Sequence, residues 1–396
     1  MIKVYFDWNC ISHSKDKFPY LLSLVKTYSK YVICPFSLAH IRDALVSRAS
    51  HPQQFEEDIV LLSQFSQQYY LWFDGKQVLP RLATPMKCVE AEGNLWEKLQ
   101  TMEWISPKIY HDLKKSLQKL MPPQTLSSIQ KENDPLKALE LIENYIHDEL
   151  RQTDLLTFMN KNNLLPQLST VESQFKSVCM GLDIFGYKSE GKDKSIMNID
   201  ADAAHIFMAG HCDYLVSKDR KLCAKANALY RKFNYQTQVI SPEELEDKLK
   251  TRVFKGFDKD YILSCITQYG HARQEVDGAH YKLLPYDVFG LFNVCFSGSS
   301  LGLDDGDTTA LFSYSFNRTP YLFNHEIECF FDTILSFLTP AAQTQFRNAF
   351  IAPFEKGDKA SCQPFFINIS SWNVTLKVTL DPNQEGLVPA MQVFVK

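Results

Sequence analysis

The sequence predicts an α/β protein: an open parallel sheet with a large helical insertion, followed by a C-terminal α+β domain. Three observations support this fold class. Short β-rich runs alternate with amphipathic helical stretches in residues 1–50 and 199–255, as in strand-helix units of a parallel sheet. Residues 50–198 between them have helical periodicity. After residue 257 the pattern changes, which predicts domains at 1–255 and 257–396.

The first strand-helix unit lies at the N-terminus. Ile2 to Phe6 is a short β-rich run that ends in Asp-Trp-Asn, and a second run, Tyr31 to Cys34, stops at Pro35. Ser37 is expected to cap the next helix, whose apolar residues have helical spacing: Leu38, Ile41 and Leu45.

The predominantly helical region contains the amphipathic stretches Glu56 to Tyr70 and Leu136 to Leu156. Breaks are expected near Pro122-Pro123 and Pro166. Because this region separates the two strand-helix units, we expect it to form a lid or a substrate platform.

Alternation returns from Ile199 to Lys255. The expected elements are a helix at Ala201–Ala209, a strand at Tyr214–Ser217, a basic helix at Arg220–Phe233 and a strand at Gln236–Ile240. Ser241-Pro242-Glu243 then opens a last helix. These strands complete the predicted sheet.

The C-terminal part differs from the first domain in its predicted secondary structure and in its net charge. An amphipathic helix at Tyr261–Tyr269 precedes β-type runs, the clearest of which is Asn373 to Leu380. Residues 257–396 hold 9 basic and 15 acidic residues, against 33 and 31 before them. We therefore expect nucleic acid to bind the first domain, and a protein partner is conceivable for the second, whose role the sequence does not reveal.

Composition excludes several classes of protein. With 45% hydrophobic and 22% charged residues, the chain is neither disordered nor fibrous, and a net charge of -4 excludes a strongly basic coat protein. Its ten cysteines form no CxxC pair, which excludes zinc-ribbon and thioredoxin-like sites. No signal core and no apolar run of about 18 residues is found, so we expect a cytoplasmic protein without a membrane span.

Acidic residues far apart in the sequence are predicted to converge at one sheet edge. Asp7 and Asp219 both follow strands, and the carboxyl ends of parallel strands share an edge. Two helices that begin at the same edge bring Asp43, and Asp200 or Asp202, towards it.

Such a cluster needs a cation. Two negative charges about 5 Å apart repel by roughly 3 kcal/mol at an effective dielectric constant near 20. Oxygen ligands with open positions suit Mg²⁺ or Mn²⁺, which activate water for attack on a phosphodiester.

At these positions the sequence resembles the PIN domain family of metal-dependent nucleases. The resemblance rests on Asp7-Trp8-Asn9 after the first strand and on the segment from Asp202 to Ser217-Lys218-Asp219, and it covers residues 1–50 and 195–250. It implies that Asp7, Asp202 and Asp219 are metal ligands supported by Asn9 and Ser217. It also implies an endoribonuclease acting on single-stranded RNA, with single-stranded DNA as another possible substrate.

The second acid of the family pattern has no clear counterpart. His40 falls nearest to its position, and Asp43 lies one turn later, so we assign Asp43 as the fourth ligand with His40 as its neighbour. Alternatives stay open: Asp43 as a solvated helix residue, Asp200 and Asp202 as helix caps, Asp7 as a turn cap, and His40 and His205 as hydrogen-bonded structural residues.

A basic stretch beside Asp219 is expected to contact the RNA backbone through Lys218, Arg220, Lys221 and Lys225. The alternative is a solvated amphipathic helix. Tyr230 and Tyr235 are expected to pack in the core rather than to stack on bases.

The sequence thus predicts metal-dependent phosphodiester hydrolysis, with a catalytically inactive PIN-like binding module as the alternative. A phosphatase of the haloacid dehalogenase type is excluded, because Asn9 stands where its acid would be. Asp304-Asp305-Gly306-Asp307 is expected to form a hairpin turn rather than a calcium loop, and His325-Glu326 lacks the second histidine of a zinc protease.

Overall fold

The computed structural model describes residues 2–29, 31–48, 50–91, 107–161, 170–189, 196–252, 272–276, 279–283, 293–297, 308–313, 320–336, 338–369, 374–381 and 388–395. The chain forms two compact units, Ile2–Leu245 and Glu246–Lys396. The division falls within helix α13 (Pro242–Arg252), near the predicted boundary at residues 255–257.

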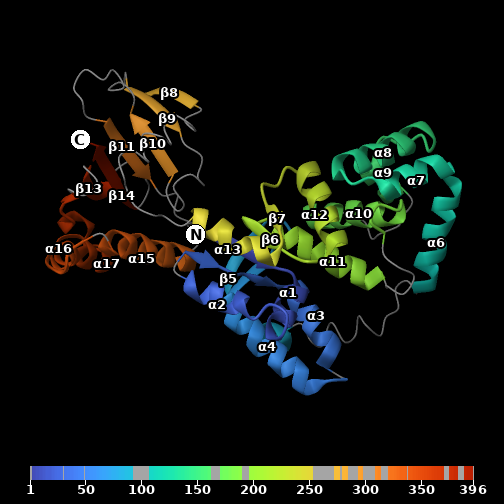
Figure 1. Cartoon of the computed structure of the whole chain (residues 1–396), viewed down its shortest axis with the longest axis horizontal. Coiled ribbons are helices and arrows are strands. Elements are labelled where there is room, and N and C mark those ends of the chain that lie inside the picture. Colours follow the sequence, from blue (N-terminus) through green and yellow to red (C-terminus); the bar gives the residue numbers. More distant parts are fainter. Residues whose placement is uncertain are drawn as a thin grey trace. The chain divides into compact units, whose positions relative to one another are not determined.

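A four-stranded parallel sheet lies in the first unit (Figure 1). Phe6 lies opposite Val216, so the two central strands end at the same level. The predicted α/β class with a parallel sheet is confirmed, and each strand lies within its predicted run. The strand order is β2 (Val32–Ile33), β1 (Ile2–Phe6), β6 (Tyr214–Val216) and β7 (Gln238–Ile240).

Helices α3 (Leu38–Arg48), α11 (Ile196–Ala209) and α12 (Arg220–Lys232) accompany these strands. The Ser37 hydroxyl accepts a hydrogen bond from the backbone N–H of Ala39 at 3.2 Å, as expected for a capping residue. The predicted start of α11 at Ala201 is wrong. The fully buried Ile199 extends the apolar face of the helix, so Asp200 and Asp202 lie inside α11 and do not cap it.

A second, smaller sheet interrupts the region that the sequence predicts as helical. Helix α4 (Pro52–Ser66) ends before the predicted Tyr70, because Gln67 and Gln68 have φ values of 48° and 69° and cannot continue a right-handed helix. An aromatic, β-favouring run follows. The sheet consists of β3 (Phe36–Ser37), β4 (Tyr69–Phe73) and β5 (Val78–Leu82), with β3 parallel and β5 antiparallel to β4.

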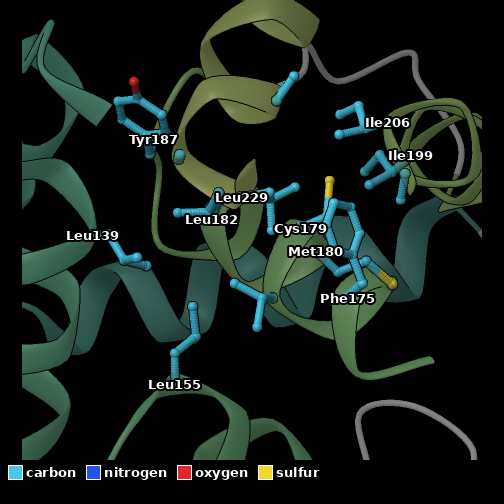
Figure 2. Packing of buried hydrophobic residues seen from close by; sticks show 14 of the residues in the cluster. Leu139, Leu155, Phe175, Cys179, Met180, Leu182, Tyr187, Ile199, Ile206 and Leu229 are labelled. Atoms are coloured by element: carbon cyan, nitrogen blue, oxygen red, sulfur yellow. The ribbon is translucent and has the colours of Figure 1, made fainter. Parts of the chain in front are cut away.

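The insertion helices are α6 (Pro107–Leu120), α7 (Pro123–Lys131), α8 (Pro135–Asp148), α9 (Leu155–Lys161) and α10 (Val171–Ile184). The predicted stretch from Leu136 to Leu156 is therefore two helices, since α8 ends at Asp148. Figure 2 shows that Leu139, Phe175 and Leu182 of the insertion pack in the same cluster as Ile206 and Leu229. The insertion and the strand-helix units thus share one hydrophobic core.

Buried ionic contacts connect three helices of this unit. Asp183 of α10, which is fully buried, accepts a hydrogen bond from Lys114 Nζ of α6 at 2.9 Å. Its other carboxylate oxygen lies 3.4 Å from Nζ of Lys225 on α12, which is only 1% exposed. Buried charges persist only when they are paired, so these contacts fix the insertion against α12.

His211, between α11 and β6, provides a prediction about pH. Burial, assisted by the charge of Lys3, lowers the pKa of His211 to about 4. Because the unfolded-state pKa is near 6.5, the folded form loses stability as the pH falls from 6.5 towards 4, by about 2 kcal/mol between about pH 7.5 and pH 5. Urea unfolding at the two pH values should show this loss of unfolding free energy. In His211→Gln the loss between the two pH values should be smaller by about 2 kcal/mol. An equal loss in both proteins would contradict the assignment.

The second unit contains a seven-stranded antiparallel sheet and helices α15 (Pro320–Ser336), α16 (Pro340–Phe346) and α17 (Ala352–Glu355). The predicted strand at Asn373–Leu380 is present as β13. The expected helix at Tyr261–Tyr269 and the turn at Asp304–Asp307 lie outside the described residues. The strand order is β12 (Phe365–Ile369), β13 (Val374–Asp381), β14 (Val388–Val395), β11 (Thr308–Ser313), β10 (Asn293–Ser297), β9 (Ala279–Leu283) and β8 (Ala272–Val276).

Candidate functional site

Asp7 and Asp219 lie at the same edge of the parallel sheet, as predicted, and Ser217 connects them. The Ser217 hydroxyl donates to Oδ2 of Asp7 at 2.9 Å and accepts a hydrogen bond from the backbone N–H of Asp219 at 3.1 Å. The side-chain amide of Asn9 also donates to Oδ2 of Asp7, at 3.4 Å. The predicted supporting residues Asn9 and Ser217 therefore contact the acid that they were expected to support.

Each of the two carboxylates has one oxygen engaged and one available. Oδ1 of Asp219 caps helix α12 by accepting backbone N–H bonds from Lys221 at 2.8 Å and Leu222 at 3.1 Å. Oδ2 of Asp219 and Oδ1 of Asp7 have no hydrogen-bond partner among the described residues. Two carboxylate oxygens are thus held at one sheet edge without a donor from the part of the chain that the structure describes.

The electrostatics of Asp7 show that the acids lie within reach of one another. Burial raises the pKa of Asp7, and the negative charges of Asp43 and Asp219 raise it further, whereas His205 and the hydrogen bond from Ser217 lower it. Asp7 is only 3% exposed. A nearby positive charge would therefore stabilise its ionised form.

Asp43 is paired with a histidine. Its Oδ2 lies 2.8 Å from Nε2 of His205, and Nδ1 of that ring lies 2.9 Å from the Tyr5 hydroxyl. The Tyr5 hydroxyl also lies 2.7 Å from the hydroxyl of Ser37. This buried polar network, which comprises Tyr5, Ser37, His40, Asp43 and His205, runs from the first strand to helices α3 and α11.

Both ring nitrogens of His40 are occupied by backbone groups. Nε2 donates to the carbonyl oxygen of Phe6 at 2.8 Å, so Nδ1 accepts from the backbone N–H of Ser37 at 3.1 Å. Burial, together with the charge of His205, lowers the pKa of His40 and keeps it neutral. His40 is a hydrogen-bonded structural residue, and neither nitrogen is free to act as a ligand or a base.

His205 is the histidine of the site whose surroundings favour its protonated form. Burial acts against its protonation, but the hydrogen bond to Asp43 and the charges of Asp43, Asp7 and Asp202 outweigh burial and raise the pKa of His205. Both of its nitrogens are engaged, which leaves none for a reacting group. His205 therefore offsets the surrounding acids, and Oδ2 of Asp43 is engaged in this pair.

The two predicted acids of α11 differ in their surroundings. Asp200, whose side chain is 41% exposed, pairs with Arg42 at 3.5 Å and with Lys176 at 3.3 Å. Asp202 is half-buried, and its charge acts on His205 and on Cys179.

The donor set fits a cation held by two carboxylates. Within the described parts of the chain, no three Asp, Glu, His or Cys side chains form a group that would hold a metal ion. Mg²⁺ is commonly held by one or two carboxylates, several waters and substrate phosphates. The unpaired oxygens of Asp7 and Asp219 fit that arrangement.

The predicted RNA-contacting residues are not equivalent. Lys225 is buried against Asp183, so the prediction that it contacts RNA is wrong. Lys221 donates to the backbone oxygen of Ser189 at 2.7 Å. Arg220 is exposed and forms no ion pair with a described residue. Lys218 is also exposed and lies between Ser217 and Asp219 in the chain.

The expected core role of the two tyrosines is confirmed for Tyr230, which is buried and donates its hydroxyl to the Ile206 carbonyl at 2.8 Å.

The sequence did not predict Tyr5 and Ser37 as members of the polar network. A signal was present for Tyr5, because residues two apart on a strand share a face, and Tyr5 lies two residues before Asp7.

Comparisons with known proteins add no further constraint. No helix in the described part of the chain has the length and apolar character to cross a membrane. The chain matches no family model, no curated protein and no solved structure.

Proposed function

We propose that the Ile2–Leu245 unit is a Mg²⁺- or Mn²⁺-dependent nuclease that hydrolyses phosphodiester bonds in single-stranded RNA. One observation supports the proposal above all: Ser217 connects Asp7 and Asp219 at the ends of two neighbouring parallel strands, and each acid keeps one unpaired oxygen. The choice of RNA rests on the resemblance of the Asp7-Trp8-Asn9 and Ser217-Lys218-Asp219 motifs to the PIN family.

The residues of the chain have distinct roles in this proposal. Asp7 and Asp219 hold the ion, and Ser217 and Asn9 fix the orientation of the Asp7 carboxylate. A bound divalent ion supplies a water of lowered pKa and neutralises charge that develops on the phosphate. His205 offsets the charge of Asp43, which keeps a further uncompensated negative charge away from the approaching substrate.

The phosphate backbone of the substrate would contact the basic side chains on either side of Asp219. Lys218 and Arg220 are exposed on either side of this acid, and phosphate contacts from such residues position a strand without reading its sequence. The proposal therefore predicts binding that weakens with rising salt and depends little on base sequence.

The test is cleavage of labelled single-stranded RNA and of DNA of the same sequence, with Mn²⁺, with Mg²⁺ or with a chelator. We expect cleavage of RNA only with the metal ions and its loss, by at least about a hundredfold, in Asp219→Asn. Asparagine still caps a helix well, so that variant should fold. The matched control is Asp200→Asn, which removes the same charge from an exposed residue paired with Lys176 and Arg42. Cleavage in the presence of chelator, or in Asp219→Asn, would overturn the proposal.

A PIN-like module that binds nucleic acid or protein without cleaving it is the second candidate. The ion pair between Asp43 and His205 favours it, because this pair removes one of the acids from the predicted ligand set. Such a module should bind RNA, show no metal-dependent cleavage and gain no thermal stability from Mn²⁺. Stabilisation by Mn²⁺ that is lost in Asp219→Asn would instead favour the nuclease.

A further inference from the structure

The side chain of Lys218 is occupied by two neighbours. Its ammonium group forms an ion pair with Glu243 and lies 4.9 Å above the ring centroid of Phe18. The two charged side chains are 48% and 53% exposed, so the pair faces water. One of the two cations adjacent to Asp219 in the chain therefore already has an anionic partner.

The backbone places this partner where it is. Strands β6 and β7 run parallel, with Val216 opposite Ile240, and the backbone N–H of Ser217 donates to the Ile240 carbonyl at 3.1 Å. Lys218 and Glu243 are the residues that follow these two strand ends at the same edge of the sheet. The register of β6 and β7 therefore brings the segments that carry Lys218 and Glu243 side by side.

The capping box of helix α13 is formed by the residue next to Glu243. In α13 the adjacent Glu244 accepts a hydrogen bond from the backbone N–H of Ser241 at 2.8 Å, which is the reciprocal half of a capping box. Glu243 directs its carboxylate to Lys218, and this contact is the largest cause that lowers the pKa of Glu243, with smaller contributions from its own backbone N–H and from Ser241. Glu243 is therefore the acid of this helical turn that faces the positive charge beside Asp219.

We propose that Glu243 competes with a substrate phosphate for Lys218, so that only a strand with a phosphate at this position releases the lysine. The proposal rests on the proposed function, because it assumes that nucleic acid binds at the Asp7 and Asp219 edge. An exposed ion pair is weak, and a phosphate forms stronger contacts with ammonium groups and releases counterions, so the exchange is feasible. Phe18 keeps the ammonium in place while its partner changes.

The consequence is selectivity for longer strands. A dinucleotide or a free mononucleotide that reaches the two carboxylates but not Lys218 leaves the Glu243 charge in place, and that charge repels it. A longer strand replaces the carboxylate with its own phosphate. Glu243 thus suppresses weak binding of small anions beside the site.

The test measures RNA affinity with Ca²⁺ in place of Mn²⁺, so that binding is observed separately from cleavage. We expect Glu243→Gln to bind single-stranded RNA about threefold to tenfold more tightly than the unaltered protein, with a steeper salt dependence. Glu246→Gln is the matched control, since Glu246 lies in the same helix, is similarly exposed and pairs with Lys250 at 2.7 Å. It should leave the affinity unchanged.

Lys218→Met tests whether the effect acts through the lysine. This variant should bind RNA more weakly. Adding Glu243→Gln to Lys218→Met should not increase the RNA affinity of that variant, just as Glu246→Gln should not increase the affinity of the unaltered protein. The proposal is overturned if Glu243→Gln binds no more tightly than Glu246→Gln, or if its full gain persists without Lys218.

The outcomes separate this inference from the proposed function. Metal-dependent cleavage with equal affinity in the two glutamine variants would overturn the role of Glu243 alone. Tighter binding by Glu243→Gln without cleavage in any variant would uphold it and support a binding module instead of a nuclease. Absence of RNA binding in all variants would overturn both.

Discussion

Replacement of Asp7 by asparagine is expected to abolish metal-dependent RNA cleavage and, at the same time, to stabilise the metal-free protein. The loss of activity should exceed about a hundredfold, because a metal ligand supports several kcal/mol of charge stabilisation in the transition state. The asparagine oxygen can still accept the hydrogen bond from Ser217, so the local structure should persist.

The gain in stability follows from the raised pKa of Asp7. Burial and the charges of Asp43 and Asp219 make its ionised form less favourable in the folded protein than in the unfolded chain. The stability that the neutral carboxyl gives is present at low pH and is lost as the pH rises through the folded-state pKa. A permanently neutral asparagine should therefore raise the melting temperature most at neutral pH and little in acid.

Thermal unfolding at several pH values, without metal, tests this expectation. Asp200→Asn again serves as the control, because Asp200 is exposed and paired with two cations, and its replacement should give no gain. A melting temperature that falls in Asp7→Asn while cleavage survives would show that Asp7 is a structural residue. Added Mn²⁺ should stabilise the unaltered protein and not the variant.

Asp183→Asn is expected to have the largest effect on stability. The change removes the negative charge between the ammonium groups of Lys114 and Lys225, both of which approach within 3.4 Å of this carboxylate. Breaking a buried ion pair by removing one partner lowers the free energy of unfolding by about 3–5 kcal/mol, because the remaining charge is left uncompensated. Urea unfolding of the two proteins at neutral pH measures the difference.

Two further variants show whether burial is the cause. Lys225→Met should be less damaging, because Asp183 keeps its contact with Lys114 and methionine fills much of the lysine volume. Glu143→Gln removes a charge from the more exposed pair with Lys232 and should change stability by less than about 1 kcal/mol. An effect of Asp183→Asn no larger than that of Glu143→Gln would contradict the interpretation of these contacts as a buried network.

Local sequence patterns predict the sheet and the pair of acids well. Short β-rich runs ending in polar residues identify β1 and β6, and parallel pairing alone then brings Asp7 and Asp219 together. Ser217 is predictable for the same reason, since it leaves β6 at the level where Asp7 leaves β1. These features depend on strand direction and register, which a sequence of alternating elements largely determines.

Other features depend on contacts that no local pattern encodes. Lys225 belongs to a basic stretch whose pattern predicts an exposed side chain. It is buried because it pairs with Asp183, which lies 42 residues earlier in the chain. The sequence pattern predicts Tyr5 as a core residue of a buried strand. Its hydroxyl forms a hydrogen bond with His205, which lies 200 residues later in the chain on a helix. The end of α4 depends on the backbone conformation of Gln67 and Gln68, which glutamine does not usually adopt.

The shared core of the insertion helices and the strand-helix units limits how this protein can be shortened. A truncated version without α6 to α10 would remove Asp183, the partner of Lys225, and would expose Ile206 and Leu229 to water (Figure 2). Such a fragment should aggregate or unfold unless these positions are redesigned. Limited proteolysis should accordingly release no smaller folded fragment from within Ile2–Leu245.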